Sequence, residues 1–250
     1  MDQFTSGYQS HLHSLKTLNL LFEYDSFLDS IKTVADMGCG AGYDTKWWAE
    51  LYTRDDPPKP RDIWVYAVDK EDKIEPDNIK GERVKKVIGN FEERVIPTTV
   101  DFIWCHNSFQ YVQNPIKTLR IWNEQLVTDG MMILSFPQTS SYVNNKYLNR
   151  AYPGVYHSYN IVNLMYMLGV CGFDCNDAYF YRDPKDPNPW IHAAVYKAQE
   201  PMDPDTTTLW DLAEKELLNP SAVKCLEKHG HLVQEEILTT WFDKDFYRVV

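Results

Sequence analysis

Thr33-Val34-Ala35-Asp36-Met37-Gly38-Cys39-Gly40-Ala41-Gly42 is the stretch of this sequence that decides its fold. It begins with a short apolar run typical of a buried strand, and alternating glycines follow at once. Residues 44–52 then have helical character. Glycines let a ligand approach without a Cβ in the way, and the helix behind them offers its free N–H groups. The stretch therefore predicts a ligand-binding turn that suits a carboxylate, a ribose or a pyrophosphate.

The rest of the chain alternates between strand-like and helix-like segments. Periodicity predicts strands at residues 33–37, 63–69, 83–88, 100–105, 131–136, 173–181 and 192–197. It predicts helices at residues 8–30, 44–52, 115–126, 159–170 and within about 208–240, while prolines make residues 53–62 a loop. Such alternation predicts a mostly parallel sheet covered by helices on both faces. The last two strands lack a helix between them and predict an antiparallel hairpin at one edge.

Composition and charge exclude several classes of protein. The chain has 250 residues, 44% of them hydrophobic and 24% charged, and a formal net charge of -11. An acidic chain must overcome repulsion from phosphate, so a nucleic-acid partner is not expected. The polar N-terminus does not resemble a signal peptide, and no apolar run approaches the ~20 residues that cross a bilayer. We therefore expect a soluble, cytoplasmic protein without a membrane anchor.

The cysteines do not predict a disulfide framework or a metal site. Their number, five, is odd and their spacing shows no pairing. Cys171 and Cys175 are spaced as a weak zinc signal, but no His/Cys pair completes it. We expect reduced thiols and no bound metal.

The glycine turn is more specific when it is read together with the strand ends that follow. Its Gly-x-Gly-x-Gly spacing differs from the Gly-x-Gly-x-x-Gly of dinucleotide folds. The pattern resembles motif I of the class I S-adenosylmethionine-dependent methyltransferases. Four further features of that family follow in order over roughly residues 30–200: Asp69 at the next strand end, Gly89-Asn90-Phe91-Glu92, the strand and turn at 100–112, and Asp129-Gly130 before the fifth strand.

This resemblance implies an architecture for the whole chain. It implies a Rossmann-like three-layer α/β/α sandwich around a mostly parallel seven-stranded sheet that ends in an antiparallel hairpin. The methyltransferase domain would span residues 31–200. Residues 1–30 would be an N-terminal helical lid segment, and residues 201–250 a C-terminal helical extension beyond a proline-rich linker.

The resemblance also implies S-adenosylmethionine as the cofactor and S-adenosylhomocysteine as its product. Asp69 would bind both ribose hydroxyls, and Asp36 the methionine portion. The full set of cofactor residues implied is Tyr8, Asp36, Gly38, Gly40, Gly42, Asp69, Lys70, Asn90, Phe91, Cys105 and His106. Asn90 departs from the aspartate usual there, although its carbonyl can accept the same hydrogen bond. Other interpretations remain open: Asp36 as a local cap, Phe91 as a core residue, and Tyr8 as plain helix packing.

The acceptor side is expected in the loops after the fourth and fifth strands. His106 and His157 are the candidate catalytic residues, because histidine titrates near neutrality and can take a proton from an acceptor. Candidate substrate-binding residues are Gln110, Tyr111, Gln138, Tyr142 and Tyr156. The alternatives are hydrogen-bonded loop histidines and a tyrosine-rich segment packed on itself.

Three functional hypotheses remain. A methyltransferase with a small-molecule acceptor is preferred, since no large recognition domain is added, and a protein side chain is the alternative acceptor. A non-catalytic binding or scaffold protein with the same fold is the second hypothesis, and a nicotinamide-dependent oxidoreductase is disfavoured by the glycine spacing. The turn His106-Asn107-Ser108-Phe109 lacks the Asn/Asp-Pro-Pro-aromatic tetrapeptide of DNA-amino methyltransferases. The oligomeric state is open, and the C-terminal helices could form a dimer contact.

Overall fold

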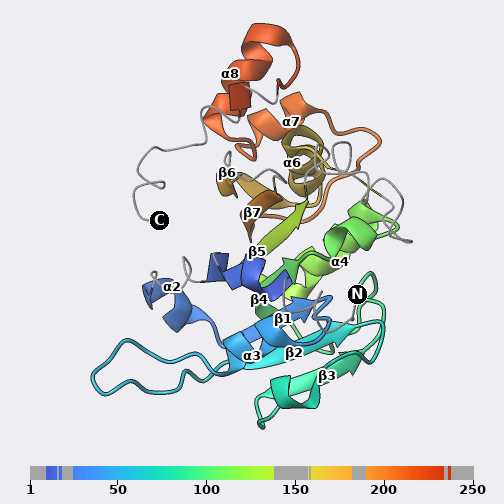
Figure 1. The fold of residues 1–250 in the computed structure, drawn as a ribbon. Helices are drawn as coiled ribbons and strands as arrows, with labels where there is room; N and C mark the ends of the chain where they lie inside the picture. The colour runs from blue at the N-terminus through green and yellow to red at the C-terminus, as the bar shows by residue number, and fades with distance from the viewer. Residues whose placement is uncertain are drawn as a thin grey trace.

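A mixed sheet of seven strands, in the order β3-β2-β1-β4-β5-β7-β6, runs through the middle of the molecule (Figure 1). The computed structural model describes residues 10–15, 17–18, 25–137, 157, 159–181, 190–233 and 236–237, without the side chains of 25–27 and 177–181. The strands are β1 (Thr33–Met37), β2 (Trp64–Asp69), β3 (Val84–Ile88), β4 (Val100–His106), β5 (Leu126–Pro137), β6 (Phe173–Tyr181) and β7 (Trp190–Lys197).

The directions of the strands confirm the predicted sheet. Pairs among β1, β2, β3, β4 and β5 are parallel, whereas β7 is antiparallel to both β5 and β6. β7 lies between β5 and β6, so the final hairpin forms the end of the sheet. The carboxyl ends of the parallel strands, including β1, β2 and β4, therefore meet at one edge, where ligands bind in open α/β sheets.

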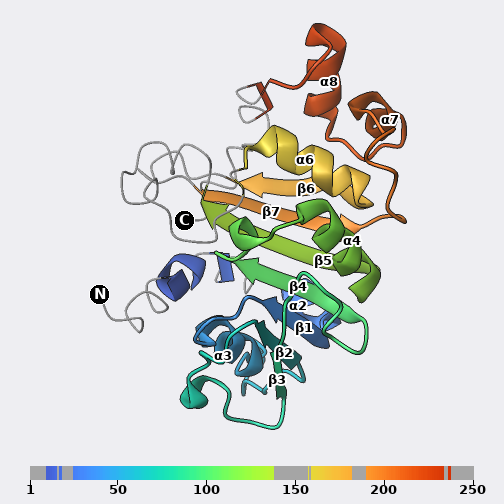
Figure 2. The ribbon, with the colours of Figure 1, turned by 90° about the vertical axis from the view of Figure 1, so that its right-hand side faces the viewer.

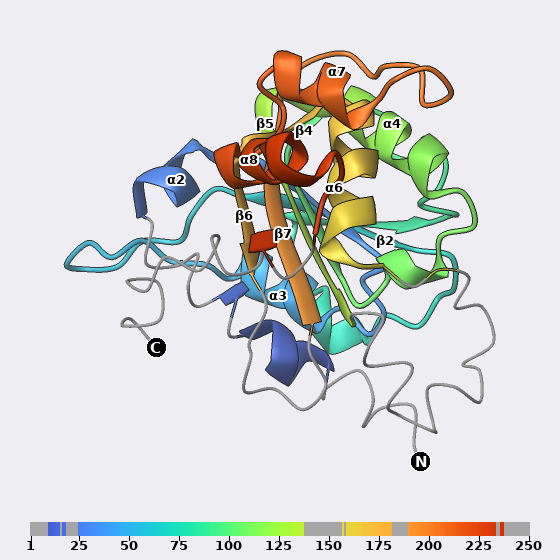
Figure 3. The same cartoon turned by 90° about the horizontal axis from the view of Figure 1, so that it is seen from above.

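The helices flank the sheet on both faces (Figure 3). They are α2 (Asp25–Ser30), α3 (Tyr43–Ala49), α4 (Pro115–Gln125), α6 (Ile161–Val170), α7 (Leu209–Glu214) and α8 (Pro220–His229), with short 3-10 turns η1 (Pro76–Asn78) and η2 (Phe109–Tyr111). Residues 10–15 and 17–18 are also helical. Asn114 and Asn160 cap α4 and α6 through their side chains, which explains why these helices begin where they do. None of the described helices combines the length and hydropathy needed to cross a membrane.

Alternate residues of β1, β2, β4, β5 and β7 supply two separate cores. On β4, Phe102 and Trp104 join Trp48 of α3, whereas Ile103 and Cys105 join the core under α4 and α6. This alternation follows from the twofold period of a strand. Polar residues at the strand ends are thereby assigned to a defined face of the sheet.

Two strand boundaries differ from the sequence prediction by two residues or more. β5 begins at Leu126, five residues before the predicted start, because the expected turn at Asp129 and Gly130 is accommodated inside the strand. Asp129 has a φ of 60°, and the β4–β5 register shifts between Val100 and Phe102. β7 begins at Trp190, two residues early, and this places Trp190 on the sheet.

The C-terminal helices extend one of these cores. Leu212 of α7, Leu226 of α8 and Ile237 are buried in the same cluster as α6 and β6. The backbone of Leu218 bridges to Cys175, so this segment covers part of the free edge of β6. Figure 1 shows α7 and α8 packed beyond α6, at the β6 end of the sheet. The boundary at residue 200 remains a prediction, since the core continues across it.

Candidate functional site

The glycine turn is tied to the end of β2 by backbone hydrogen bonds. The N–H groups of Gly38 and Cys39 both donate to the carbonyl of Val68, at 2.8 and 3.0 Å. Gly40 donates its N–H to Oδ2 of Asp69 at 2.9 Å. Gly38, Gly40 and Gly42 have φ angles of 80°, 53° and 85°, a region that other residues rarely adopt. The sequence pattern therefore produces a turn whose geometry requires glycine.

The space around two of these glycines differs. A Cβ on Gly38 would lie 2.3 Å from Oγ of Ser108, which itself donates a hydrogen bond to the Gly38 carbonyl. Among the residues that the structure describes, a Cβ on Gly40 would meet no atom within 4 Å. Gly38 is therefore glycine because the turn after β4 packs against it. Gly40 faces open space, through which a ligand can approach the backbone.

Asp69, at the end of β2, organises this turn. Its Oδ2 accepts from Gly40, and its Oδ1 accepts from the N–H of Glu71 at 3.0 Å. A carboxylate offers about four lone-pair sites, so each oxygen keeps one for a further donor. A ribose with two adjacent hydroxyls suits such a pair of oxygens. The neighbouring Lys70 is exposed.

Asp36 lies deeper, beneath the turn. It is 2% exposed, and its Oδ2 accepts from Oγ1 of Thr45 on α3 at 2.5 Å. Burial, reinforced by the nearby carboxylate of Asp44, raises the pKa of Asp36 well above its ordinary value. A cation placed beside it would offset this penalty.

Three other predicted cofactor residues, Asn90, Phe91 and Cys105, differ from one another in their surroundings. Asn90 uses Oδ1 to accept from the N–H of Glu92 at 3.1 Å. Phe91 is 7% exposed and packs against Trp122, and its ring edge also lies 3.5 Å from where a Gly38 Cβ would be. Phe91 is thus a core residue that also borders the turn. The thiol of Cys105 is fully buried in the core under α4 and α6, so its side chain is not presented to a ligand.

A row of polar side chains crosses β4, β5 and β7. The strand registers pair His106 with Ser135, and Ser135 with His192. Oγ of Ser135 lies 2.8 Å from Nδ1 of His192. His106 follows Trp104 by two residues and therefore lies on the same sheet face, the face that α3 covers. We call His106, Ser135 and His192 the histidine row.

The N-terminal helical segment, by which we mean residues 10–15 and 17–18, covers the histidine row. Figure 2 shows this segment beside the carboxyl ends of β4 and β5. Nδ1 of His13 lies 3.4 Å from Nε2 of His106, and the His13 ring stacks on Trp190 with centroids 3.9 Å apart. Trp190 also stacks on His106, at 5.0 Å. Planar rings thus surround His106 on more than one side.

Asp44, in the first turn of α3, anchors this N-terminal segment. Its Oδ1 lies 2.5 Å from Nδ1 of His11 and accepts from Oγ of Ser14 at 2.6 Å, while Oδ2 accepts from Nε1 of Trp104 at 2.9 Å. Burial acts to raise the pKa of Asp44, but the hydrogen bonds from His11, Ser14 and Trp104 act against it, and the net shift is downward. Asp44 is therefore ionised at neutral pH and holds the segment against the domain.

His106 is neutral at physiological pH. It is 7% exposed, and burial lowers its pKa from an ordinary 6.5 to about 4, against the opposing influence of Asp44. A neutral imidazole offers one donor and one acceptor. Its Nδ1 lies 3.3 Å from Oγ of Ser10 and its Nε2 faces His13, so a ligand would bond to His106 by replacing one of these two partners. A neutral ring would not repel a neighbouring cation.

Among the predicted catalytic and acceptor residues, Gln110 and Tyr111 lie in η2, shortly after β4, whereas His157 makes its contacts elsewhere. Gln110 is 2% exposed and donates from Nε2 to Oδ1 of Asn107 at 2.7 Å. Its buried Oε1 has no hydrogen-bond partner among the described residues, which leaves an acceptor for a ligand N–H or O–H. Tyr111 follows in η2 and is partly exposed. His157 lies apart from the histidine row in its contacts, with Nε2 3.0 Å from the carbonyl of Gln113.

Some site residues escaped the sequence analysis, and some predicted ones cannot be placed. Tyr8, Gln138, Tyr142 and Tyr156 lie outside the described residues. The unforeseen residues are His13, Asp44, Ser108, Ser135, Trp190 and His192. Asp44 could have been suspected from its place in the first turn after the glycines. Ser108 meets Gly38 because β1 and β4 are paired. The others meet through the β5–β7 register and the docking of the N-terminal segment, which no local pattern specifies.

Comparisons with known proteins agree with this geometry. A family model described as a methyltransferase domain matches residues 8–175. No curated protein matched the sequence. Several solved structures share the fold at low identity, and three of them illustrate the range.

The first is a Bacillus halodurans protein described as a methyltransferase, which is 12% identical to this chain and has a TM-score of 0.54. The match covers 71% of this chain and 99% of the Bacillus protein. The second is the Burkholderia thailandensis 1,6-didemethyltoxoflavin-N1-methyltransferase with its substrate and S-adenosylhomocysteine, at 18% identity and a TM-score of 0.52, covering 78% and 86%. The third is the Synechocystis magnesium protoporphyrin IX methyltransferase with bound S-adenosylmethionine, at 14% identity and a TM-score of 0.54, covering 76% and 80%.

Proposed function

The chain belongs to the methyltransferase domain family, and from this premise we propose that it transfers the methyl group of S-adenosylmethionine to a small-molecule acceptor. The single observation that carries the proposal is the glycine turn. Gly40 opens onto free space while its N–H is held by Asp69, a carboxylate with lone pairs to spare. A nucleoside suits that combination.

The residues present fit the proposed cofactor. Asp69 would accept hydrogen bonds from the ribose hydroxyls, and the Gly38–Gly42 backbone would approach the methionine portion. Asp36 would supply negative charge beneath the ligand's ammonium group, and Phe91 would border the same pocket beside Gly38. S-adenosylmethionine would supply an electrophilic methyl carbon on a sulfonium.

The protein's part in the transfer is chiefly alignment. Methyl transfer is an in-line displacement, so holding the acceptor close and in line supplies much of the acceleration. Neutral His106 would orient the acceptor by a hydrogen bond without repelling the sulfonium. With a pKa of about 4, it is a weak base, and we assign it a positioning role more readily than full proton removal.

The enclosure of the histidine row favours a small acceptor. Ser135 is fully buried, His106 nearly so, and His13 and Trp190 stack above them. Aromatic rings of this kind would stack on a planar molecule that takes the place of the N-terminal segment, and they suit it more than a protein side chain on a folded surface. The Burkholderia and Synechocystis proteins named above are named for small-molecule acceptors, 1,6-didemethyltoxoflavin and magnesium protoporphyrin IX, which supports this preference.

A labelling experiment tests the acceptor class. The purified protein is incubated with methyl-labelled S-adenosylmethionine and an extract of its native cells, which is then separated by ultrafiltration. We expect the label in the low-mass fraction, and only background with Asp69→Ala. Label in the protein fraction would instead support a protein acceptor. Cofactor binding without any transfer would support the non-catalytic alternative.

A further inference from the structure

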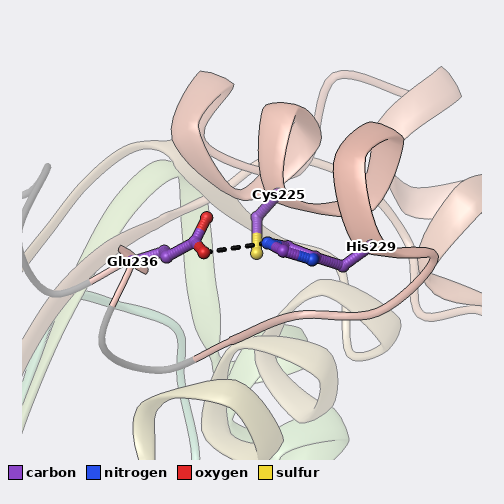
Figure 4. A group of neighbouring side chains, drawn as sticks. All are labelled: Cys225, His229 and Glu236. Carbon is purple, nitrogen blue, oxygen red and sulfur yellow. Dashed lines mark hydrogen bonds and ion pairs between the residues drawn. The ribbon is translucent and has the colours of Figure 1, made fainter.

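A second cluster of chemically active side chains lies at the C-terminal end of α8, away from the glycine turn. Sγ of Cys225, a ring nitrogen of His229 and a carboxylate oxygen of Glu236 all lie within 4.8 Å of one another (Figure 4). Cys225 and His229 are four residues apart on one helix, so they share a face. Nε2 of His229 is 2.8 Å from Oε1 of Glu236.

The chain after α8 folds back to complete this cluster. Gly230 ends the helix in the left-handed conformation, with a φ of 73°. The N–H of Val233 then donates to Sγ of Cys225 at 3.1 Å. Leu232 and Ile237 are buried in the main core, and Ile237 directly follows Glu236. The three donor atoms are therefore brought together by packing as well as by their own attraction.

Lys228 gives the cluster a competing interpretation. Its Nζ lies 3.0 Å from Oε1 of Glu236, so the group could be only an ion-pair network at a helix end. Hydrogen bonds from Lys228 and His229 lower the pKa of Glu236, which is ionised at neutral pH. An ion-pair network does not, however, need a cysteine sulfur at the same point. The side chains of His229 and Glu236 are also 28% and 41% exposed, which leaves an entry path from solvent.

We propose that Cys225, His229 and Glu236 bind a zinc ion. Thiolate, imidazole and carboxylate are the donors that zinc takes in proteins, and this combination of soft and hard donors is unsuited to magnesium or calcium. Water would fill the fourth position. Binding releases the thiol proton and displaces the Lys228 ammonium from Glu236. The ion would link Glu236 to α8 and so help to hold residues 236–237 against the main core.

Cobalt substitution tests the site directly, because a thiolate ligand gives Co²⁺ a charge-transfer absorption. The full chain, free of affinity tags and stripped with chelator, is titrated with Co²⁺ and then with Zn²⁺. We expect the absorption to appear with one ion per chain and to disappear when Zn²⁺ displaces Co²⁺. Cys225→Ser should abolish it. His229→Gln and Glu236→Gln should weaken binding at least about tenfold, since loss of even an outer partner costs that much.

Two further variants separate the metal site from an ion-pair network. Glu227→Gln removes an exposed carboxylate on the same helix and should bind Co²⁺ as the unmodified chain does. Lys228→Met removes the competing ammonium and should tighten binding. The proposal fails if the unmodified chain gives no thiolate absorption. It also fails if His229→Gln, a substitution at a partly exposed side chain that the core does not depend on, binds Co²⁺ with unchanged affinity.

Discussion

Gly38 and Gly40 lie two residues apart in one turn, but substitutions at them should act differently. Gly40→Ala introduces a Cβ into open space, so stability falls only by the backbone cost of about 1–2 kcal/mol. Gly38→Ala adds a clash with Ser108, worth about 1–3 kcal/mol more. Thermal or urea unfolding measures both losses. Affinity for S-adenosylhomocysteine should fall in both variants.

The double variant Gly38→Ala with Ser108→Gly serves as the control for this pair. It removes the Ser108 side chain that a Cβ on residue 38 would meet, so part of the lost stability should return. The interpretation is wrong if Gly38→Ala and Gly40→Ala destabilise the protein equally, or if Ser108→Gly gives no recovery.

The depressed pKa of His106 predicts a pH dependence of stability. In the unfolded chain His106 takes up a proton below about pH 6.5, whereas in the folded chain it does so only near pH 4. The unfolded state thus binds more protons in this window, so stability falls as the pH drops from 6.5 to 4. At ~1.4 kcal/mol per pKa unit, the shift from 6.5 to about 4 corresponds to about 3 kcal/mol of the free energy of unfolding.

His106→Gln removes this titration without adding charge. We expect its free energy of unfolding to depend less steeply on pH between 6.5 and 4 than that of the unmodified chain, measured by urea unfolding at several pH values. His157→Gln, at a histidine with a different environment, is the matched control. Parallel curves for the unmodified chain and His106→Gln would contradict a neutral, buried His106.

At the scale of elements, the docking of the N-terminal helical segment depends on Asp44. Asp44→Ala leaves His11 and Ser14 without their shared acceptor, and hydrogen bonds to a charged group contribute about 1.5–3 kcal/mol each. We expect backbone amide exchange to accelerate at residues 10–15 and methyl transfer to decline. Asp55→Ala, in an exposed loop, should change neither. Unchanged exchange in Asp44→Ala would show that the segment is held by other contacts.

Most elements could be predicted from the sequence because their signals are local. β1 and β6 match the predicted residues. β1 is a short apolar run that ends at the glycines, and β6 begins with alternating apolar and polar residues, Phe173-Asp174-Cys175-Asn176, which is the period of a strand. The start of β5 could not be predicted, because Asp129 and Gly130 favour a turn locally while pairing with β4 keeps them in the strand. The histidine row depends in turn on the register between β5 and β7, which is a property of the assembled sheet.

At the scale of the whole molecule, the C-terminal helices share the main core, so the chain should unfold as one unit. Leu226 on α8 is 1% exposed, and Leu226→Ala should cost about 2–5 kcal/mol. Calorimetry should show the whole transition shifting to lower temperature. A separate, earlier transition in this variant would instead indicate that residues 201–250 form an independent unit.

The fold class and the cofactor side of the site were accessible from the sequence, whereas the acceptor side was not. Gly38, Gly40 and Asp69 act through backbone geometry within two adjacent strands, and their spacing records that geometry. His13, Trp190 and His192 come from opposite ends of the chain, and only the complete sheet brings them to His106. The proposed acceptor side is therefore assembled by tertiary structure.

The central claim is that the turn from Gly38 to Gly42, with Asp69, binds the nucleoside of S-adenosylmethionine. Calorimetric titration with S-adenosylhomocysteine tests it most directly. The account predicts saturable binding by the unmodified chain, binding at least tenfold weaker for Asp69→Ala (about 1.4 kcal/mol), and unchanged binding for Asp77→Asn, an exposed carboxylate nearby in sequence. Absence of binding by the unmodified chain, or equal binding by Asp69→Ala, would contradict it.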